Sequence, residues 1–235
     1  MFFERQHMTE VPRQRTGFLF DLDGTLVDSV YDHVMAWQEA LRAENIRLSY
    51  WRIHRKIGMS GGLFTNMLLR ETGLDLSPAR VEHLARLHAE AYKSRSASVE
   101  PLPGARALLD YLVATGLPVA IATSGRMETA RPVLETLGLD FDKVPVVTRD
   151  QVKYAKPDPD LFITAAARLG IPIEHCNVIG DSVWDMLAAR RCRAFGIGLL
   201  SGGYGREELE RSGAAIVYED PAELLKHIDE VGGRL

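Results

Sequence analysis

Acidic side chains form two short clusters that lie far apart along the chain. Asp21 and Asp23 stand two residues apart in DLDGTLVDS, at the end of the short apolar run 17–22. Asp181 and Asp185 stand four residues apart in GDSVWDM, where a helix is expected to begin. Carboxylate oxygens grouped in this way suit Mg²⁺, which usually keeps several waters and meets a phosphate. The four aspartates therefore predict a cation site with a place for an anion.

Two hydroxyl side chains and one lysine provide the complementary groups. Thr123 and Ser124 end a predicted strand in AIATSGR, and Lys156 precedes Pro157 in AKPDPDLF. Proline disfavours the helical region for the residue before it, so Lys156 is expected to be extended. Asp158 is then the expected N-cap of the following helix. This arrangement leaves the ammonium of Lys156 free to meet a phosphate.

The apolar pattern predicts the elements that position these groups. Strands are expected at 17–22, 118–123, 144–147, 176–180 and 194–197, with helices at 105–114, 127–137, 161–169, 186–191 and 222–231. Strands that alternate with helices predict an α/β fold with a doubly wound parallel sheet covered on both faces. Ligands bind beyond the carboxyl ends of strands in such sheets. The acidic, hydroxyl and lysine side chains are therefore expected to meet at that edge.

The stretch from residue 31 to 99 shows helical spacing and no strand pattern. Val30, Val34, Trp37 and Leu41 recur at intervals of four, three and four residues, which is typical of one face of an amphipathic helix. Two more helices are expected near 63–68 and 81–91. An insert with its own core can fold on two linkers. We therefore expect an N-terminal arm at 1–15, a core domain at 16–30 and 100–235, and an inserted all-helical domain at 31–99.

Composition excludes several classes of protein. The 235 residues carry a net charge of −4, which gives no sign of a nucleic-acid partner. No apolar run approaches a membrane span, and residues 1–15 lack a signal-peptide core. Two cysteines are too few for a disulfide framework. The expected protein is cytoplasmic, without a membrane or nucleic-acid partner, and its oligomeric state is left open.

Charge is unevenly divided between the two expected domains. Residues 31–99 carry 10 Lys and Arg against 7 Asp and Glu, a balance of +3, whereas the rest of the chain has a balance of −7. A mildly basic helical domain facing a carboxylate-rich site favours the entry of anionic substrates.

The motifs and their order resemble the haloacid dehalogenase superfamily, in its branch of phosphoglycolate phosphatase and β-phosphoglucomutase. DLDGTLVDS resembles the first motif, Thr123 the second, Lys156 the third and GDSVWD the fourth. The resemblance covers most of the chain. It implies a Rossmann-like core with an α-helical cap over the site, and a Mg²⁺-dependent phosphatase that acts on a small phosphorylated metabolite.

The resemblance also implies a role for each motif residue. Asp21 is expected to be the nucleophile that forms an aspartyl-phosphate. Asp23 is expected to protonate the leaving oxygen and then to help activate water. The phosphoryl oxygens are expected to be bound by Thr123, Ser124 and Lys156.

Mg²⁺ is expected among the same aspartates. The resemblance assigns it the carboxylate of Asp21, the backbone carbonyl of Asp23 and the carboxylate of Asp181, with Asp185 orienting a metal-bound water. The metal allows an anionic carboxylate to approach an anionic phosphate.

Substrate choice in such proteins rests largely on the cap. His33, Arg52, Arg55 and Lys56 are candidate specificity residues, because they lie near the linker or before the glycine-rich loop 58–62. The alternative for His33 is a plain helix-surface histidine, and for the basic cluster a solvated face.

Two other functions compete with hydrolysis of a phosphate ester. A phosphomutase of the β-phosphoglucomutase type is suggested by His33 and Trp37, but the loop where that relative has a substrate-binding arginine reads GMSGG at 58–62. A non-catalytic phosphate-binding module would not require the acid/base residue Asp23. A dehalogenase is disfavoured as well, because that branch generally lacks this second aspartate.

Overall fold

The computed structural model describes residues 15–59, 61–74 and 77–234. The arm expected at 1–15 lies outside these residues apart from Arg15. No helix in the described ranges is long and apolar enough to cross a membrane.

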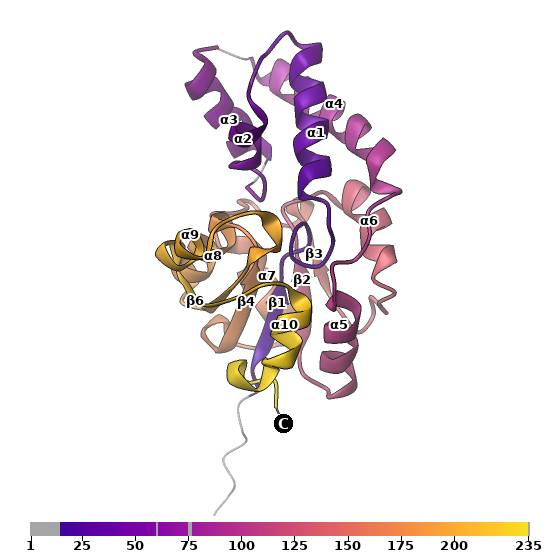
Figure 1. The fold of residues 1–235 in the computed structure, drawn as a ribbon, viewed down its shortest axis with the longest axis vertical. Coiled ribbons are helices and arrows are strands. Elements are labelled where there is room, and N and C mark those ends of the chain that lie inside the picture. The colour runs from indigo at the N-terminus through magenta and orange to yellow at the C-terminus, as the bar shows by residue number, and fades with distance from the viewer. Residues whose placement is uncertain (1–14, 60, 75–76, 235) are drawn as a thin grey trace, which may run out of the picture.

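A six-stranded parallel sheet forms the centre of the molecule, with the strand order β3-β2-β1-β4-β5-β6 (Figure 1). Its first strand pairs with β2 on one side and β4 on the other, so the chain winds outward in both directions from β1. This order confirms the doubly wound fold. The strands are β1 (Gly17–Phe20), β2 (Val119–Ala122), β3 (Val146–Val147), β4 (Cys176–Gly180), β5 (Phe195–Leu199) and β6 (Ala214–Tyr218).

Helices cover both faces of this sheet because the strands are apolar on both sides. Phe18 and Phe20 of β1 face one apolar core, while Leu19 faces the other. The first core is covered by α5 (Ala105–Ala114), α6 (Met127–Thr136), α10 (Pro221–Lys226) and the 3₁₀ turn η4 (Ile228–Val231). The second is covered by α7 (Asp160–Leu169) and α8 (Val183–Cys192). The 3₁₀ turns η1 (Arg149–Gln151), η2 (Ile173–His175) and η3 (Leu200–Gly202) lie in connections.

The structure corrects the expected end of the sheet. A helix and a strand that the apolar pattern does not predict, α9 (Arg206–Ser212) and β6, follow β5. The helix has seven residues and buries only Leu209, so it carries no helical periodicity. Two of the five residues of β6 are partly or fully exposed, so the strand also lacks a continuous apolar run.

The expected N-cap of α7 is wrong. The helix begins at Asp160 with Pro159 at its N-cap. The carboxylate of Asp158 lies outside the helix and pairs with Arg191 at 3.1 Å. Two prolines in KPDP place the turn one residue later than the capping preference of aspartate suggests.

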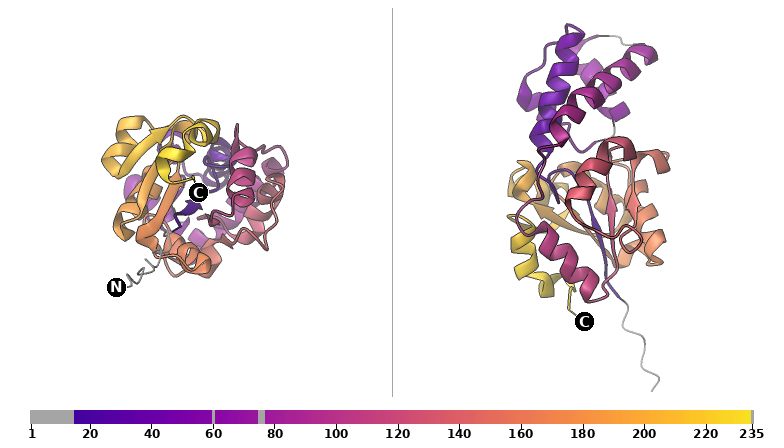
Figure 2. Two further views of the ribbon diagram at one scale, coloured as in Figure 1. Left: turned by 90° about the horizontal axis from the view of Figure 1, so that it is seen from below. Right: turned by 90° about the vertical axis from the view of Figure 1, so that its right-hand side faces the viewer.

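Four helices form a separate insert above the carboxyl ends of the strands (Figures 1 and 2). Its core contains Trp37, Phe64 and Leu84, all of them buried. The helices are α1 (Val30–Ala43), α2 (Tyr50–His54), α3 (Gly61–Thr72) and α4 (Pro78–Ser96). The five-residue α2 was not predicted from the sequence, and the described part of the insert contains no strand, as expected.

The two linkers of the insert run side by side. Val27 and Pro101 form an antiparallel bridge. The N–H of Asp28 donates to the carbonyl of Glu100 at 3.0 Å, and the N–H of Leu102 donates to the carbonyl of Leu26 at 2.9 Å. The insert therefore leaves and re-enters the core at one place.

Candidate active site

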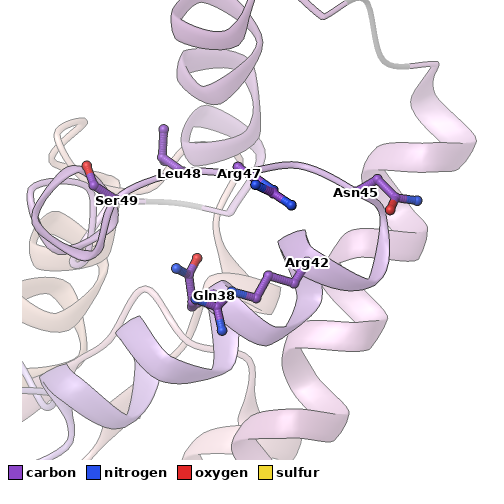
Figure 3. A pocket seen from close by; sticks show the side chains of 6 residues that line it. All are labelled: Gln38, Arg42, Asn45, Arg47, Leu48 and Ser49. Carbon is purple, nitrogen blue, oxygen red and sulfur yellow. The ribbon is translucent and has the colours of Figure 1, made fainter.

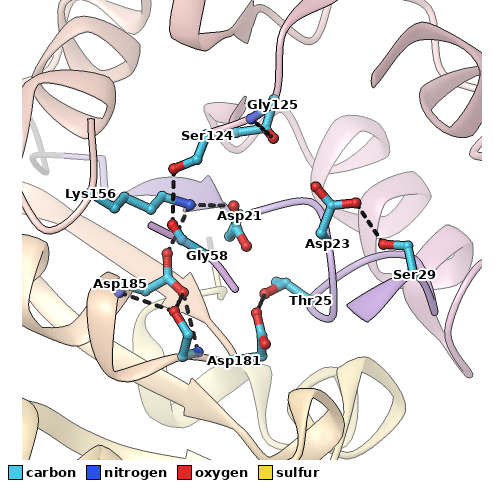
Figure 4. A network of polar contacts seen from close by, with 12 residues as sticks. Asp21, Asp23, Thr25, Ser29, Gly58, Ser124, Gly125, Lys156, Asp181 and Asp185 are labelled. Carbon is cyan, nitrogen blue, oxygen red and sulfur yellow. Dashed lines mark hydrogen bonds and ion pairs between the residues drawn. The ribbon is translucent and has the colours of Figure 1, made fainter. Parts of the chain in front are cut away.

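Three aspartates meet beyond the ends of β1 and β4 (Figure 4). One carboxylate oxygen from each of Asp21, Asp181 and Asp185 lies within 4.8 Å of the others, and all three residues are buried. Asp21 follows the central strand, and its N–H continues the sheet by donating to the carbonyl of Ile179 at 2.9 Å. The doubly wound topology therefore brings together carboxylates that lie about 160 residues apart, as the sequence predicts.

The start of α8 fixes Asp185. Its Oδ2 accepts hydrogen bonds from the hydroxyl of Ser182 at 2.5 Å and from the N–H of Ser182 at 3.2 Å, as part of a capping box. Its Oδ1 lies 2.8 Å from the ammonium of Lys156, but accepts no hydrogen bond of good geometry in the described part of the chain. This buried oxygen is therefore available to a cation or to a water bound by one.

Lys156 lies completely buried between two of the aspartates. Its Nζ donates to Oδ1 of Asp21, pairs with Asp185 and lies 5.0 Å from the ring centre of Phe162. Burial opposes the ammonium charge, but the carboxylates of Asp185 and Asp21 outweigh it and raise the pKa of Lys156. The lysine is thus held as a cation where an anion would enter.

The remaining charge at this site is negative. Burial raises the pKa of Asp21 to about 7, with Lys156 opposing the shift and the neighbouring carboxylates adding to it. Burial also raises the pKa of Asp181 well above its ordinary value, and Asp185 and Asp21 add to that shift. Three carboxylates that face one ammonium would be stabilised by a divalent cation. The all-oxygen donor set therefore fits Mg²⁺.

Two glycines pack closely against the carboxylate of Asp181. Gly24 has φ +82°, and a Cβ on it would come within 2.5 Å of Oδ2 of Asp181. A Cβ on Gly202 would overlap the same oxygen. The other oxygen, Oδ1, accepts a hydrogen bond from Thr25 Oγ1 at 3.0 Å. Backbone packing therefore fixes the position of this carboxylate.

We expect Gly202→Ala to weaken Mg²⁺ binding by about 10-fold or more, because the added methyl group must displace Asp181. Calorimetric titration with Mg²⁺ measures the change. Gly205→Ala is the matched control, since its Cβ would meet only Glu208, at 3.5 Å. Equal Mg²⁺ affinity of the Gly202 and Gly205 variants would contradict the role of this packing.

Asp23 faces the insert rather than the carboxylate cluster. Its Oδ1 accepts a hydrogen bond from Ser29 Oγ at 2.6 Å and lies 3.2 Å from Nε2 of His33. Burial tends to raise the pKa of Asp23, but His33 and Ser29 outweigh it and lower that pKa. The carboxylate of Asp23 is not part of the three-aspartate cluster, and the expected use of its backbone carbonyl for a metal stays a prediction.

A second histidine, which the sequence reasoning missed, extends this contact into the insert. His88 Nε2 lies 3.2 Å from Nδ1 of His33, and the His88 ring stacks on Trp37 at 4.3 Å between centroids. Tyr92 stacks on the other ring, that of His33, at 3.8 Å. Burial, with the charge of His33, lowers the pKa of His88 well below 6.5. The only signal in the sequence that could have indicated His88 is its position on the side of α4 that faces the rest of the insert.

The neutral His88 is expected to make the protein sensitive to acid. The unfolded chain binds a proton at this residue below pH 6.5 and the folded chain does not, so stability falls as pH drops through that value. When the pH is lowered from 7.5 to 5.5, the free energy of unfolding of wild type should fall by about 1.4 kcal/mol more than that of His88→Gln. Urea unfolding at the two pH values measures the difference. His83→Gln on the same helix is the control, because His83 is partly exposed beside Glu44. An equal pH dependence of wild type and His88→Gln would contradict this.

The hydroxyl residues predicted to bind phosphate lie at the end of β2. Thr123 is buried, and its Oγ1 accepts the N–H of Gly125 at 3.0 Å. Ser124 Oγ donates to the carbonyl of Gly58 in the insert at 3.0 Å (Figure 4). One of the two hydroxyls therefore shapes its own loop, while the other joins the core to the insert.

A pocket of about 410 Å³ lies between the core and the insert. Asp21, Asp23 and Ser124 line it from the core, and Trp37 and Phe64 are part of an apolar wall from the insert. The lining also includes residues that the sequence did not single out: His88, Arg126 and Arg149. Arg126 and Arg149 follow strands β2 and β3, so the same topological rule could have pointed to them.

The four candidate specificity residues fall in different places. His33 and Lys56 line the pocket, whereas Arg52 and Arg55 are not among its described lining residues. Lys56 Nζ lies 2.6 Å from Glu71, which also pairs with Arg52 at 3.5 Å. Their role in substrate choice stays a prediction.

Arg55 joins the insert to the core instead. It pairs with Glu208 of α9, and its guanidinium lies 4.4 Å over the ring of Tyr204. Beside it, His54 Nε2 lies 2.8 Å from the carbonyl of Gly202. The same segment of the insert thus contacts the loop that packs on Asp181.

Comparison with known proteins defines the family. The model of the haloacid dehalogenase-like hydrolases matches residues 16–193, and the chain belongs to this family. Hexitol phosphatase A of Escherichia coli (strain K12) is 35% identical over 73% of the chain and 77% of its own length. A phosphoglycolate phosphatase of Rhodospirillum rubrum is 31% identical over 88% of both chains. The crystal structure of a hydrolase from Pseudomonas syringae, 57% identical, superposes with a TM-score of 0.91 over 93% of this chain and all of that one.

Proposed function

We propose that this hydrolase is a Mg²⁺-dependent phosphatase that cleaves a small phosphorylated metabolite through an aspartyl-phosphate on Asp21. The observation that carries the proposal is the buried group of three carboxylates, two of which pair with Lys156 and one of which, that of Asp21, lines the pocket. A carboxylate nucleophile needs neighbouring cations to approach a phosphate dianion. Lys156 provides one such charge, and Asp21, Asp181 and Asp185 would hold Mg²⁺, which supplies the other.

The proposed reaction has two displacements at phosphorus. An oxygen of Asp21 attacks, the bond from phosphorus to the ester oxygen breaks, and the leaving oxygen receives a proton through Asp23. Water then attacks the phosphoryl group, gives its proton to Asp23, and releases inorganic phosphate with Asp21 restored. His33 Nε2 lies 3.2 Å from Oδ1 of Asp23, within hydrogen-bond distance of the carboxylate that carries the proton. Lys156 and the loop at Thr123 and Ser124 bind the phosphoryl oxygens.

The pocket favours a small substrate with an apolar face. Trp37 and Phe64 stack at 4.1 Å between centroids and give the insert side an aromatic wall, while Arg126 and Arg149 place positive charge at the core side. Three relatives are named as a hexitol phosphatase, a phosphoglycolate phosphatase and a fructose-1-phosphate phosphatase, and these names all indicate small phosphorylated substrates. We therefore propose a sugar or polyol phosphate, or a phosphoglycolate-type acid, as the substrate.

Removal of metal tests the proposal directly. We expect EDTA to reduce hydrolysis of p-nitrophenyl phosphate by about 100-fold or more, and added Mg²⁺ to restore it, because the carboxylates otherwise repel the phosphate. A panel of phosphoglycolate, sugar 1- and 6-phosphates and polyol phosphates then ranks substrates by phosphate release. Full activity in EDTA would contradict the metal requirement. Isomerised sugar phosphate without phosphate release would favour the mutase instead.

A further inference from the structure

His54 of the insert bonds directly to the backbone that packs on Asp181. It is the last residue of α2 and is buried, and its Nε2 lies 2.8 Å from the carbonyl oxygen of Gly202. A carbonyl only accepts hydrogen bonds, so Nε2 carries the proton and the histidine donates. Gly202 in turn leaves no room for a Cβ beside Oδ2 of Asp181. A single backbone residue therefore separates this side chain of the insert from a carboxylate of the three-aspartate cluster.

The two residues that follow Gly202 also contact the insert. A Cβ on Gly203 would come within 3.0 Å of Nε2 of His54. The hydroxyl of Tyr204 donates to the carbonyl of Arg55 at 3.0 Å, and the Tyr204 ring lies 5.6 Å from the ring of His54 between centroids. The loop is therefore held against the insert over three consecutive residues.

The residue before Gly202 joins the same loop to the other support of Asp181. Ser201 Oγ donates at 2.6 Å to the carbonyl of Gly24, which is the second glycine that packs on this carboxylate. The loop 201–204 is thus attached to the carboxylate support on one side and to the insert on the other. A shift of the insert must either break these contacts or move the loop that confines Asp181.

The C-terminal end of α2 is the end that holds this helix in place. Tyr31 of α1 stacks on the His54 ring at 5.4 Å between centroids, with the two planes 14° apart, which fixes the direction of the imidazole N–H. At the other end, the N-cap Ser49 lines a hollow of about 630 Å³ within the insert (Figure 3). The first two residues of the helix, Tyr50 and Trp51, are exposed. The position of α2 on the core therefore relies on the contacts around His54.

We propose that His54 is a positioning residue for the metal site, and that its hydrogen bond to Gly202 makes docking of the insert and binding of Mg²⁺ strengthen each other. The inference rests on the proposed function, because it requires Mg²⁺ at Asp21, Asp181 and Asp185. With the bond in place, the loop holds the carboxylate of Asp181 in one position before the cation arrives. Without it, the cation must also order the carboxylate, so its affinity falls. Because linkage is reciprocal, bound Mg²⁺ stabilises the docked insert by the same factor.

Calorimetric titration with Mg²⁺, with no substrate present, tests the hydrogen bond. His54→Phe keeps an aromatic ring beside Tyr31 and Tyr204 but has no N–H, and we expect it to bind Mg²⁺ about 5-fold or more weakly than wild type. His54→Gln should bind within about twofold of wild type, because its amide N–H donor lies as many bonds from Cβ as Nε2 does. His83→Phe, at a partly exposed histidine of α4, is the control and should also bind as wild type does.

The converse measurement separates this role from simple anchoring of the insert. Hydrogen exchange of the backbone amides of α2 should slow on addition of Mg²⁺ in wild type and in His54→Gln, but much less in His54→Phe. Anchoring alone would lower the free energy of unfolding of His54→Phe in urea and leave its Mg²⁺ affinity unchanged.

The possible failures of this inference and of the proposed function are distinct. Equal Mg²⁺ affinity of His54→Phe and wild type would overturn the inference and leave the proposed metal site intact. The same holds if His54→Gln binds Mg²⁺ as weakly as His54→Phe, because the hydrogen bond is then not the cause. Wild type that binds no Mg²⁺ would instead overturn the proposed metal requirement, and this inference with it.

Discussion

Asp21→Asn is expected to reduce kcat for phosphate ester hydrolysis by about 10³-fold or more. Asparagine keeps the size of the side chain but is neutral and a poor nucleophile. The variant should still fold, because the ion pair between Lys156 and Asp185 at 2.8 Å remains. Steady-state kinetics with p-nitrophenyl phosphate at saturating Mg²⁺ measures the loss.

A chemical readout distinguishes the nucleophile from a merely structural role. Acid-quenched wild type should carry a phosphoryl group on the peptide that contains Asp21, and Asp21→Asn should not. Asp158→Asn is the matched control, since this carboxylate is half exposed and pairs with Arg191. Retention of a tenth of wild-type activity by Asp21→Asn would refute the covalent mechanism.

Lys156→Met is expected to destabilise the fold as well as to abolish activity. The side chain is completely buried between the carboxylates of Asp21 and Asp185, so its removal leaves buried charge without a partner. Breaking a buried pair in this way costs about 3–5 kcal/mol. Urea unfolding measures the free energy. The exposed Lys153→Met should change it by about 0.5 kcal/mol or less.

The double variant Lys156→Met/Asp185→Asn separates the effect of the unpaired buried charge on stability from the effect of lost side-chain packing. Removing a carboxylate together with the lysine should recover part of the lost stability, because the uncompensated charge is gone. Activity should stay absent in the double variant. A Lys156→Met protein within 1 kcal/mol of wild type would show that the buried ion pairs do not stabilise the fold.

The predictable part of the site follows from topology. Asp21, Thr123 and Asp181 each follow a strand in the sequence, and parallel strands that wind outward from β1 must bring their carboxyl ends to one edge. Long elements with a clear apolar pattern were also predicted well. For example, α5 spans Ala105–Ala114, as the pattern indicates. Short elements with few buried residues, such as α9, carry too little pattern to be found.

Contacts between the insert and the core could not be predicted. Helical spacing shows that part of α4 is buried, but it does not say that His88 meets His33, which lies 55 residues earlier. The pairing of Arg55 with Glu208 joins positions 153 residues apart, and no local pattern encodes that distance. Such contacts depend on how the insert sits on the core, which only the folded structure shows.

The paired linkers have a consequence for how such proteins diversify. Because the chain leaves the core at Asp28 and returns at Glu100, joined by a backbone hydrogen bond of 3.0 Å, the insert is attached as if at a single point. A different set of helices with the same two ends could be exchanged there by recombination without altering any strand of the sheet. Selection can therefore change the walls of the pocket while the aspartates and the lysine stay in place.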